Sequence, residues 1–250
     1  MIKKTLILLV LGLSPITTYA ALQANNDSLI TGVSLPASLN VLANDTTDTD
    51  NALNISAVDS TSNQGGTVTD AGNGIRSYAP PTGFTGSDGF SYTMNDGSGS
   101  EDTATVSIQV KPVTPYSGTL TQDTTWTADN VYLISGDVTV PLGVTLTINA
   151  GTVIKFQALS DDSSGGNDTA RSELIITNGS LIAEGTPSEP IILTSNTGTP
   201  AAGDWGGIRH TGNGQLTLRY ATIEYATLGV DYRVDGGFIV APVIENSTIR

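Results

Sequence analysis

The second half of the chain is built from very short apolar runs that follow one another after single turns. Three of them are Val138–Val140, Val144–Ile148 and Thr152–Phe156. Further along, Ile223 and Ile249 occupy equivalent places in two similar runs that lie twenty-six positions apart. A period in the twenties with three short strands per turn is typical of a parallel β-helix, in which each coil stacks on the coil before it.

These units repeat along the chain. Leu174–Ala183 echoes Leu146–Lys155, which predicts that the two segments are successive repeats. A second β-sandwich of the same length is the alternative, and it would show longer strands joined by frequent hairpin signals. Such signals, for example Asn178-Gly179, are sparse here. The pattern therefore favours a β-helix with inward Val, Leu and Ile.

Longer motifs support the same fold. Gly136–Phe156 is followed, in order, by Leu181–Thr186, Pro190–Ser195 and Gly203–Ile208. This succession resembles a bacterial right-handed β-helix family over residues 118–250. The resemblance implies a right-handed parallel β-helix in a secreted or surface setting.

The chain stops at Arg250, inside a strand-like run and without a polar capping segment. Repeat folds need a cap, because the last coil otherwise exposes apolar residues and unpaired backbone groups. We therefore expect the β-helix to be incomplete at the C-terminus and the chain to be the N-terminal piece of a longer protein. Between two coils, Asp161–Asp168 reads as an inserted loop, for which solvation and calcium binding are both open.

One loop in the first half concentrates oxygen-bearing side chains. Residues 44–51 hold the carboxylates of Asp45, Asp48 and Asp50 together with two amides. Such a loop repels itself unless a cation occupies it, and calcium accepts about six to eight oxygen ligands in flexible geometry. A solvated turn between strands is the alternative, since Asp and Asn favour turns.

The sequence around this loop carries further motifs. Tyr78–Gly97 contains the order Gly-Phe-x-Gly-x-Asp-x-Phe-x-Tyr and an Asp-Gly turn, and Thr103–Val110 closes the segment as an alternating strand. Together with the Ala-Asn-Asp loop, this resembles the cadherin-like, immunoglobulin-like (Ig-like) repeats of bacterial surface and secreted proteins, over residues 23–112. The resemblance implies an N-terminal β-sandwich, which we place at residues 21–112.

Calcium is the one cofactor that we expect. Asp45, Asp48 and Asp50 are the predicted ligands, with help from Asp27 at the opening of the domain and Asp96 at the distal turn. The loop departs from the family pattern, because Thr46-Thr47 stands before Asp48 where the family alternates Asp directly after Asn-Asp.

The N-terminus has the features of an export signal. Lys3 and Lys4 precede the apolar run Thr5–Leu13, which is much shorter than the roughly 20 residues of a membrane span. Small residues around Ala20 predict cleavage there, so residues 1–20 form a signal peptide. We expect a secreted or cell-surface protein with no membrane span after cleavage.

The composition and net charge of the chain limit the classes of partner that we expect. The formal net charge is −14, and removal of Lys3 and Lys4 with the signal makes it −16. Nucleic acid and anionic membranes require a basic face, so neither is an expected partner. The chain has no cysteine, so disulfides do not hold the fold. Between the two domains, prolines within Lys111–Tyr116 predict a linker at residues 113–117.

The visible segment shows no catalytic constellation. Glycoside hydrolysis needs two carboxyl groups, but the Ile223 and Ile249 alignment places Glu224 over Arg250 as an ion pair. His210 is the only histidine, and we expect it at the surface or in a turn. Trp126 and Trp205 are candidates for sugar stacking, although packing against the core is favoured for both.

The leading hypothesis is an adhesive or structural bacterial protein in which a calcium-stiffened β-sandwich presents a β-helix. Extracellular carbohydrate or surface proteins are the expected partners. The alternative is the N-terminal part of a secreted polysaccharide lyase or glycoside hydrolase, with the β-sandwich as an accessory module.

Overall fold

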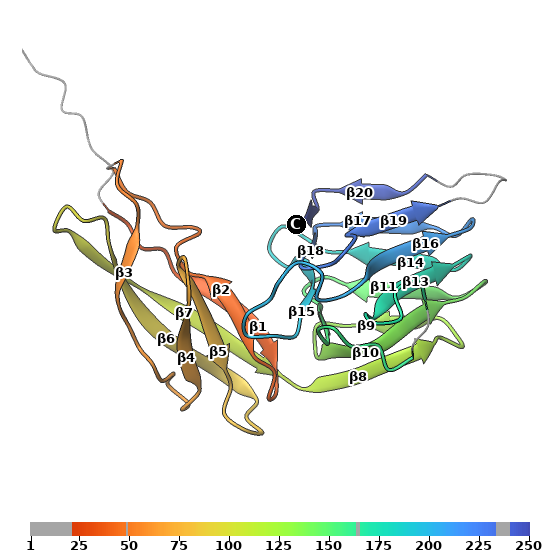
Figure 1. Cartoon of the computed structure of the whole chain (residues 1–250), viewed down its shortest axis with the longest axis horizontal. Helices are drawn as coiled ribbons and strands as arrows, with labels where there is room; N and C mark the ends of the chain where they lie inside the picture. The colour runs from red at the N-terminus through yellow and green to blue at the C-terminus, as the bar shows by residue number, and fades with distance from the viewer. Residues whose placement is uncertain (1–21, 49, 164–165, 234–240) are drawn as a thin grey trace, which may run out of the picture.

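The computed structural model describes residues 22–48, 50–163, 166–233 and 241–250, and these ranges contain strands and turns but no helix. Figure 1 shows a β-sandwich on the left and a stack of short strands on the right. The predicted all-β fold, an Ig-like domain followed by a parallel β-helix, is confirmed. The predicted signal peptide lies outside the described residues.

Two sheets form the Ig-like domain. Its strands are β1 (Asp27–Gly32), β2 (Ala37–Asn40), β3 (Asn54–Val58), β4 (Thr67–Gly72), β5 (Ile75–Ala79), β6 (Gly86–Asn95) and β7 (Glu101–Lys111). One sheet has the order β1-β7-β6-β3 and the other has the order β2-β5-β4. Side chains alternate in β7, so Ala104, Val106, Ile108 and Val110 all point into the buried core.

Each coil of the β-helix gives strands to three faces. Its strands are β8 (Val113–Thr119), β9 (Thr124–Trp126), β10 (Val131–Val140), β11 (Thr145–Asn149), β12 (Val153–Phe156), β13 (Glu173–Thr177), β14 (Ser180–Glu184), β15 (Ile191–Ser195), β16 (Gly207–Thr211), β17 (Leu216–Arg219), β18 (Ala221–Ile223), β19 (Val230–Arg233), β20 (Val243–Glu245) and β21 (Thr248–Ile249). The first face is β10-β12-β15-β18-β21, the second is β10-β13-β16-β19 and the third is β9-β11-β14-β17-β20. All these pairs are parallel, and the long β10 serves two faces.

The coils stack in register, so equivalent residues lie above one another. Ile223 pairs with Ile249, as their spacing predicts. On the third face, Leu146 pairs with Leu181. Figure 1 shows this stacking, with β8 and β10 at the bottom of the β-helix and β19 and β20 at the top.

The predicted correspondence between Leu174–Ala183 and Leu146–Lys155 is wrong. Leu174 lies on the second face and pairs with Val138 of β10. Short apolar strands look alike on all three faces, and the segment 157–172 between β12 and β13 lengthens one coil. Sequence similarity therefore finds the repeat but not the face.

The first strand of the β-helix begins earlier than the sequence predicts. Residues 113–117, the predicted linker, belong to β8, which pairs in parallel with β10. Pro115 is tolerated because β8 lies at the edge of its sheet and pairs there with β10 alone among the described strands. Pro112 is the one residue that separates β7 from β8.

Both tryptophans belong to the core. Trp126 stacks on Tyr132 with ring centroids 4.6 Å apart, and Trp205 stacks on Phe156 at 3.8 Å. Both indoles are buried. The preference for core packing over a sugar platform is confirmed.

The prediction for His210 is wrong, because its side chain is fully buried. It occupies an inward position of β16, between Ile176 of the coil below and Tyr232 of the coil above. Its ring stacks on that of Tyr232 with centroids 4.8 Å apart. Burial lowers the pKa of the imidazole. The polar neighbours of His210 in sequence hide its inward orientation.

Candidate functional site

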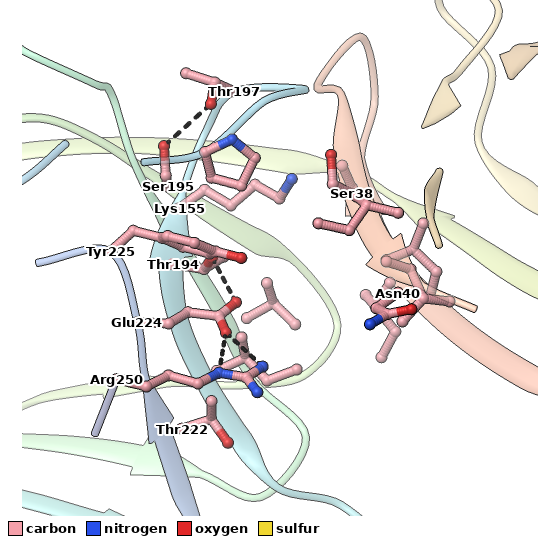
Figure 2. Close-up of a pocket in the computed structure, with 18 of the residues that line it drawn as sticks. Ser38, Asn40, Lys155, Thr194, Ser195, Thr197, Thr222, Glu224, Tyr225 and Arg250 are labelled. Atoms are coloured by element: carbon pink, nitrogen blue, oxygen red, sulfur yellow. Dashed lines mark hydrogen bonds and ion pairs between the residues drawn. The ribbon is translucent and has the colours of Figure 1, made fainter. Parts of the chain in front are cut away.

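A line of outward side chains on the first face of the β-helix faces the Ig-like domain. Lys155 of β12 pairs with Thr194 of β15, and the next coils place Glu224 and Arg250 at the equivalent positions. Thr194 Oγ1 donates to Glu224 Oε1 at 2.8 Å, and Arg250 Nη2 donates to Glu224 Oε2 at 2.8 Å. Figure 2 shows these residues as a ladder along the strands. The predicted stack of Glu224 on Arg250 is confirmed.

Lys155 joins the two domains. It is outward-facing, yet only 2% exposed because the Ig-like domain covers it. Its Nζ donates a hydrogen bond to the carbonyl of Pro36 at 2.5 Å. Burial lowers the pKa of Lys155 to about 7, and the negative charge of Glu224 opposes part of this effect. A buried lysine head is therefore satisfied by the backbone of the other domain.

Apolar residues of the two domains pack together beside Lys155 and form a buried joint between the domains. Leu35 of the Ig-like domain forms a buried cluster with Val131 and Val153, which face outward from the β-helix. A further hydrogen bond from Ser38 Oγ to the carbonyl of Gly198 crosses the interface at 2.5 Å. The two domains are thus packed together over apolar and polar contacts.

A cleft of about 490 Å³ opens between the domains beside this joint. The ladder from Lys155 to Arg250 and the side chain of Tyr225 line one wall, and Ser38 and Asn40 of β2 lie on the other (Figure 2). Hydroxyl, amide, carboxylate and guanidinium groups therefore converge on one space. Pockets with a few such convergent polar groups are the usual sites of ligand binding.

The carboxylate in the cleft is engaged by neighbouring side chains. Glu224 is the single carboxylate among its described lining residues, and both oxygens are engaged, by Thr194 and by Arg250. Acid–base cleavage of a glycosidic bond uses two carboxyl groups on opposite sides of the scissile bond. The lining of this cleft does not offer such a pair within the ranges described.

The structure brings together two of the five predicted calcium ligands. Tyr92 donates to Asp45 Oδ2 at 2.9 Å, and Asp27 lies beside both. Burial raises the pKa of Asp27 to about 6; the hydrogen bond from Tyr92 opposes part of this rise, and the negative charge of Asp45 adds to it. The Oδ2 atom of Asp27 is buried and has no hydrogen-bond partner among the residues described.

The other three predicted ligands lie elsewhere. Asp48 and Asp50 are exposed. Asp96 is buried, and its carboxylate accepts hydrogen bonds from Thr47 and from the backbone of Ser98. Across the described part of the chain, no group of three or more His, Cys, Asp or Glu side chains is arranged to hold a metal ion.

Sequence reasoning missed Lys155 as a site residue. Its place in the short run Thr152–Phe156 gives an outward position, which normally means solvent. The burial of its side chain depends on the other domain, and nothing in the run itself reports that contact.

Comparisons with known proteins agree with the two-domain geometry. Residues 15–109 match the family model of a bacterial Ig domain, and residues 118–237 match that of a pectate-lyase-like β-helix domain. The chain therefore joins a bacterial Ig domain to a pectate-lyase-like β-helix, in the order that its sequence predicts. A search of curated proteins found no significant match.

This domain pair is that of a surface or extracellular protein. Within the described ranges, no helix is long and apolar enough to cross a membrane.

Proposed function

We propose that the chain is an adhesive or structural extracellular protein whose two domains act as one rigid unit and hold a ligand in the cleft between them. The buried joint carries this proposal. Leu35 packs on Val131 and Val153, and the Lys155 ammonium reaches the Pro36 carbonyl. An accessory module tethered to an enzyme would move relative to it, since relative motion is the default unless the interface is large and apolar.

The lining of the cleft suggests the class of ligand. Ser38, Asn40 and Tyr225 present hydroxyl and amide groups beside the Glu224–Arg250 ion pair. Such groups exchange hydrogen bonds with sugar hydroxyls or with the polar groups of a surface protein. Extracellular carbohydrate or surface protein is therefore the proposed partner.

Rigid coupling predicts that the full chain unfolds in one calorimetric transition. The Leu35→Asp variant should split this transition in two, because a carboxylate in the apolar joint separates the domains without touching the inward column of the β-helix. Leu142→Asp is the matched control, since Leu142 is exposed and should leave a single transition. Two independent transitions in the parent chain would contradict the proposal.

A second candidate is the N-terminal part of a polysaccharide-cleaving enzyme, favoured by the pectate-lyase-like match. Incubation of the full chain with pectate and other acidic and neutral polysaccharides separates the two candidates. Unsaturated products or new reducing ends would support the enzyme. Retention on a polysaccharide without turnover would support the adhesive protein.

Calcium stiffening of the Ig-like domain is the remaining part of the proposal. The buried, unpaired Oδ2 of Asp27 beside Asp45 is the observation that supports it. The melting temperature of the full chain should rise between chelator and millimolar calcium, because metal bound only to the folded state stabilises it. Asp45→Asn should reduce this rise, whereas Glu101→Gln, at an exposed position of β7, should not. An unchanged melting temperature in the parent would favour a plain turn.

A further inference from the structure

Two carboxylates stack at the corner between the first and second faces of the β-helix. Asp137 of β10 and Glu173 of β13 directly precede the paired residues Val138 and Leu174. Asp137 is 4% exposed and Glu173 is 6% exposed. The backbone N–H of Glu173 donates to Asp137 Oδ1 at 2.8 Å, which fixes the lower carboxylate against the upper strand.

Residues on either side of positions 164–165, between β12 and β13, lie against this pair. The backbone N–H of Asn167 donates to Glu173 Oε2 at 2.6 Å, and Ser163 Oγ accepts from the backbone of Asp137 at 2.9 Å. A Cβ added to Gly166 would lie 2.0 Å from Glu173 Oε2 and 2.8 Å from Asp137 Oδ2. Both carboxylates therefore approach Gly166 closely, and a larger side chain at this position would collide with them.

Two oxygen atoms at this place lack partners. Asp137 Oδ2 is buried without a hydrogen bond, and so is Oδ2 of Asp161, within the residues that the structure describes. Burial raises the pKa of Asp137 to about 6, with added contributions from the negative charges of Asp161 and Glu173. The nearest arginine in sequence, Arg171, pairs with Asp168 instead.

Buried charges are expensive unless a partner compensates them. Asp137 and Glu173 have backbone donors for one oxygen each, but no positive side chain among their described contacts. The missing partner is either a proton shared by the pair or a cation. The side chains that meet here are carboxylates, and carboxylate oxygens are the ligands that calcium prefers.

We propose that Asp137 and Glu173 bind a calcium ion beside residues 161–163 and 166–168, with these two carboxylates as its side-chain ligands. The ion fastens this inserted segment to two successive coils. Two carboxylates suffice as side-chain ligands, because calcium completes its shell with backbone carbonyls and water. This site lies in the β-helix, apart from Asp27 and Asp45 of the Ig-like domain, and does not depend on the proposed adhesive function.

Calcium titration of the full chain by calorimetry tests the site. Asp137→Asn and Glu173→Gln should each lose one equivalent of bound calcium, and with it a rise of about 5–10 °C in melting temperature at a hundredfold excess over Kd. Asp162→Asn is the matched control, because Asp162 is an exposed carboxylate of the same segment. It should bind and melt like the parent.

Two results would overturn the site. One is an unchanged calcium stoichiometry in Asp137→Asn. The other is a fall in stability of the parent as pH rises through about 6 that is the same with calcium and with chelator and is absent from Asp137→Asn, which would mean that the pair holds a proton. The Asp45→Asn variant separates this outcome from failure of the Ig-like site, because it should keep the equivalent bound in the β-helix.

Discussion

Replacing Lys155 with methionine is expected to raise the free energy of unfolding at pH 6 by about 2–4 kcal/mol. The lysine is buried under the Ig-like domain, and burial lowers its pKa to about 7. Methionine keeps an apolar side chain of similar length without the charge. The gain is reduced because the Pro36 carbonyl loses its donor, a loss of about 1–3 kcal/mol.

The pH dependence identifies the cause. The folded pKa of Lys155 lies below the unfolded value of 10.5, so the unfolded chain binds the extra proton between about pH 7 and pH 10.5. The cost of burying the charge is complete below pH 7 and disappears as pH rises to 10.5. The advantage of Lys155→Met should therefore be greatest at pH 5–6 and absent near pH 10.

Chemical denaturation of parent and variant across this pH range measures the difference. Asp137, Asp27 and other groups titrate alike in both chains and cancel. Lys111→Met is the control, since Lys111 also donates to a backbone carbonyl, that of Ala128, but is only partly buried. Lys111→Met should change the free energy of unfolding by less than Lys155→Met does. An advantage of Lys155→Met that persists unchanged at pH 10 would show that packing, and not charge, is responsible.

Much of the fold could be predicted because local patterns are sufficient for it. The alternation of Thr103–Val110 fixes which side chains of β7 enter the core, and the short runs at residues 138–156 correspond to β10, β11 and β12. The linker at residues 113–117 could not be recognised as a strand. Prolines normally exclude a central strand, and the sequence does not say that β8 occupies an edge.

Site residues could be paired from the sequence only where successive coils keep the same repeat length. Glu224 and Arg250 could be paired from sequence, because the coil between Ile223 and Ile249 keeps the period. Asp137 and Glu173 could not, since the segment between β12 and β13 breaks the period and hides their stacking. A charged residue just before an apolar strand looks like an ordinary turn residue until the coil above it is placed.

Contacts between residues that are far apart in the sequence could not be predicted either. The acidic loop at residues 44–51 suggested one calcium site, but only Asp45 of that loop approaches Asp27. Tyr92 lies far from Asp45 in the sequence, and its buried hydroxyl donates a hydrogen bond to Asp45 that sets this geometry. Spacing within a loop shows how many ligands are near in sequence, whereas the sandwich core determines which of them meet.

Trp205→Ala is expected to lower the free energy of unfolding by about 3–5 kcal/mol. The indole is fully buried, stacks on Phe156 with ring centroids 3.8 Å apart, and donates from Nε1 to the carbonyl of Glu224 at 2.9 Å. Truncation leaves a large cavity in the column and an unpaired carbonyl. Denaturant unfolding measures the loss, and an unchanged midpoint would mean that the indole is not part of the core.

The conservative Trp205→Phe variant separates packing from positioning. It keeps an aromatic ring against Phe156 but removes the N–H that holds the backbone of Glu224. It should cost less stability than the alanine variant, yet still weaken binding of any ligand in the cleft, because Glu224 and its ion pair with Arg250 line that cleft. If ligand affinity falls only in proportion to stability, Trp205 supports the β-helix alone and does not position the cleft.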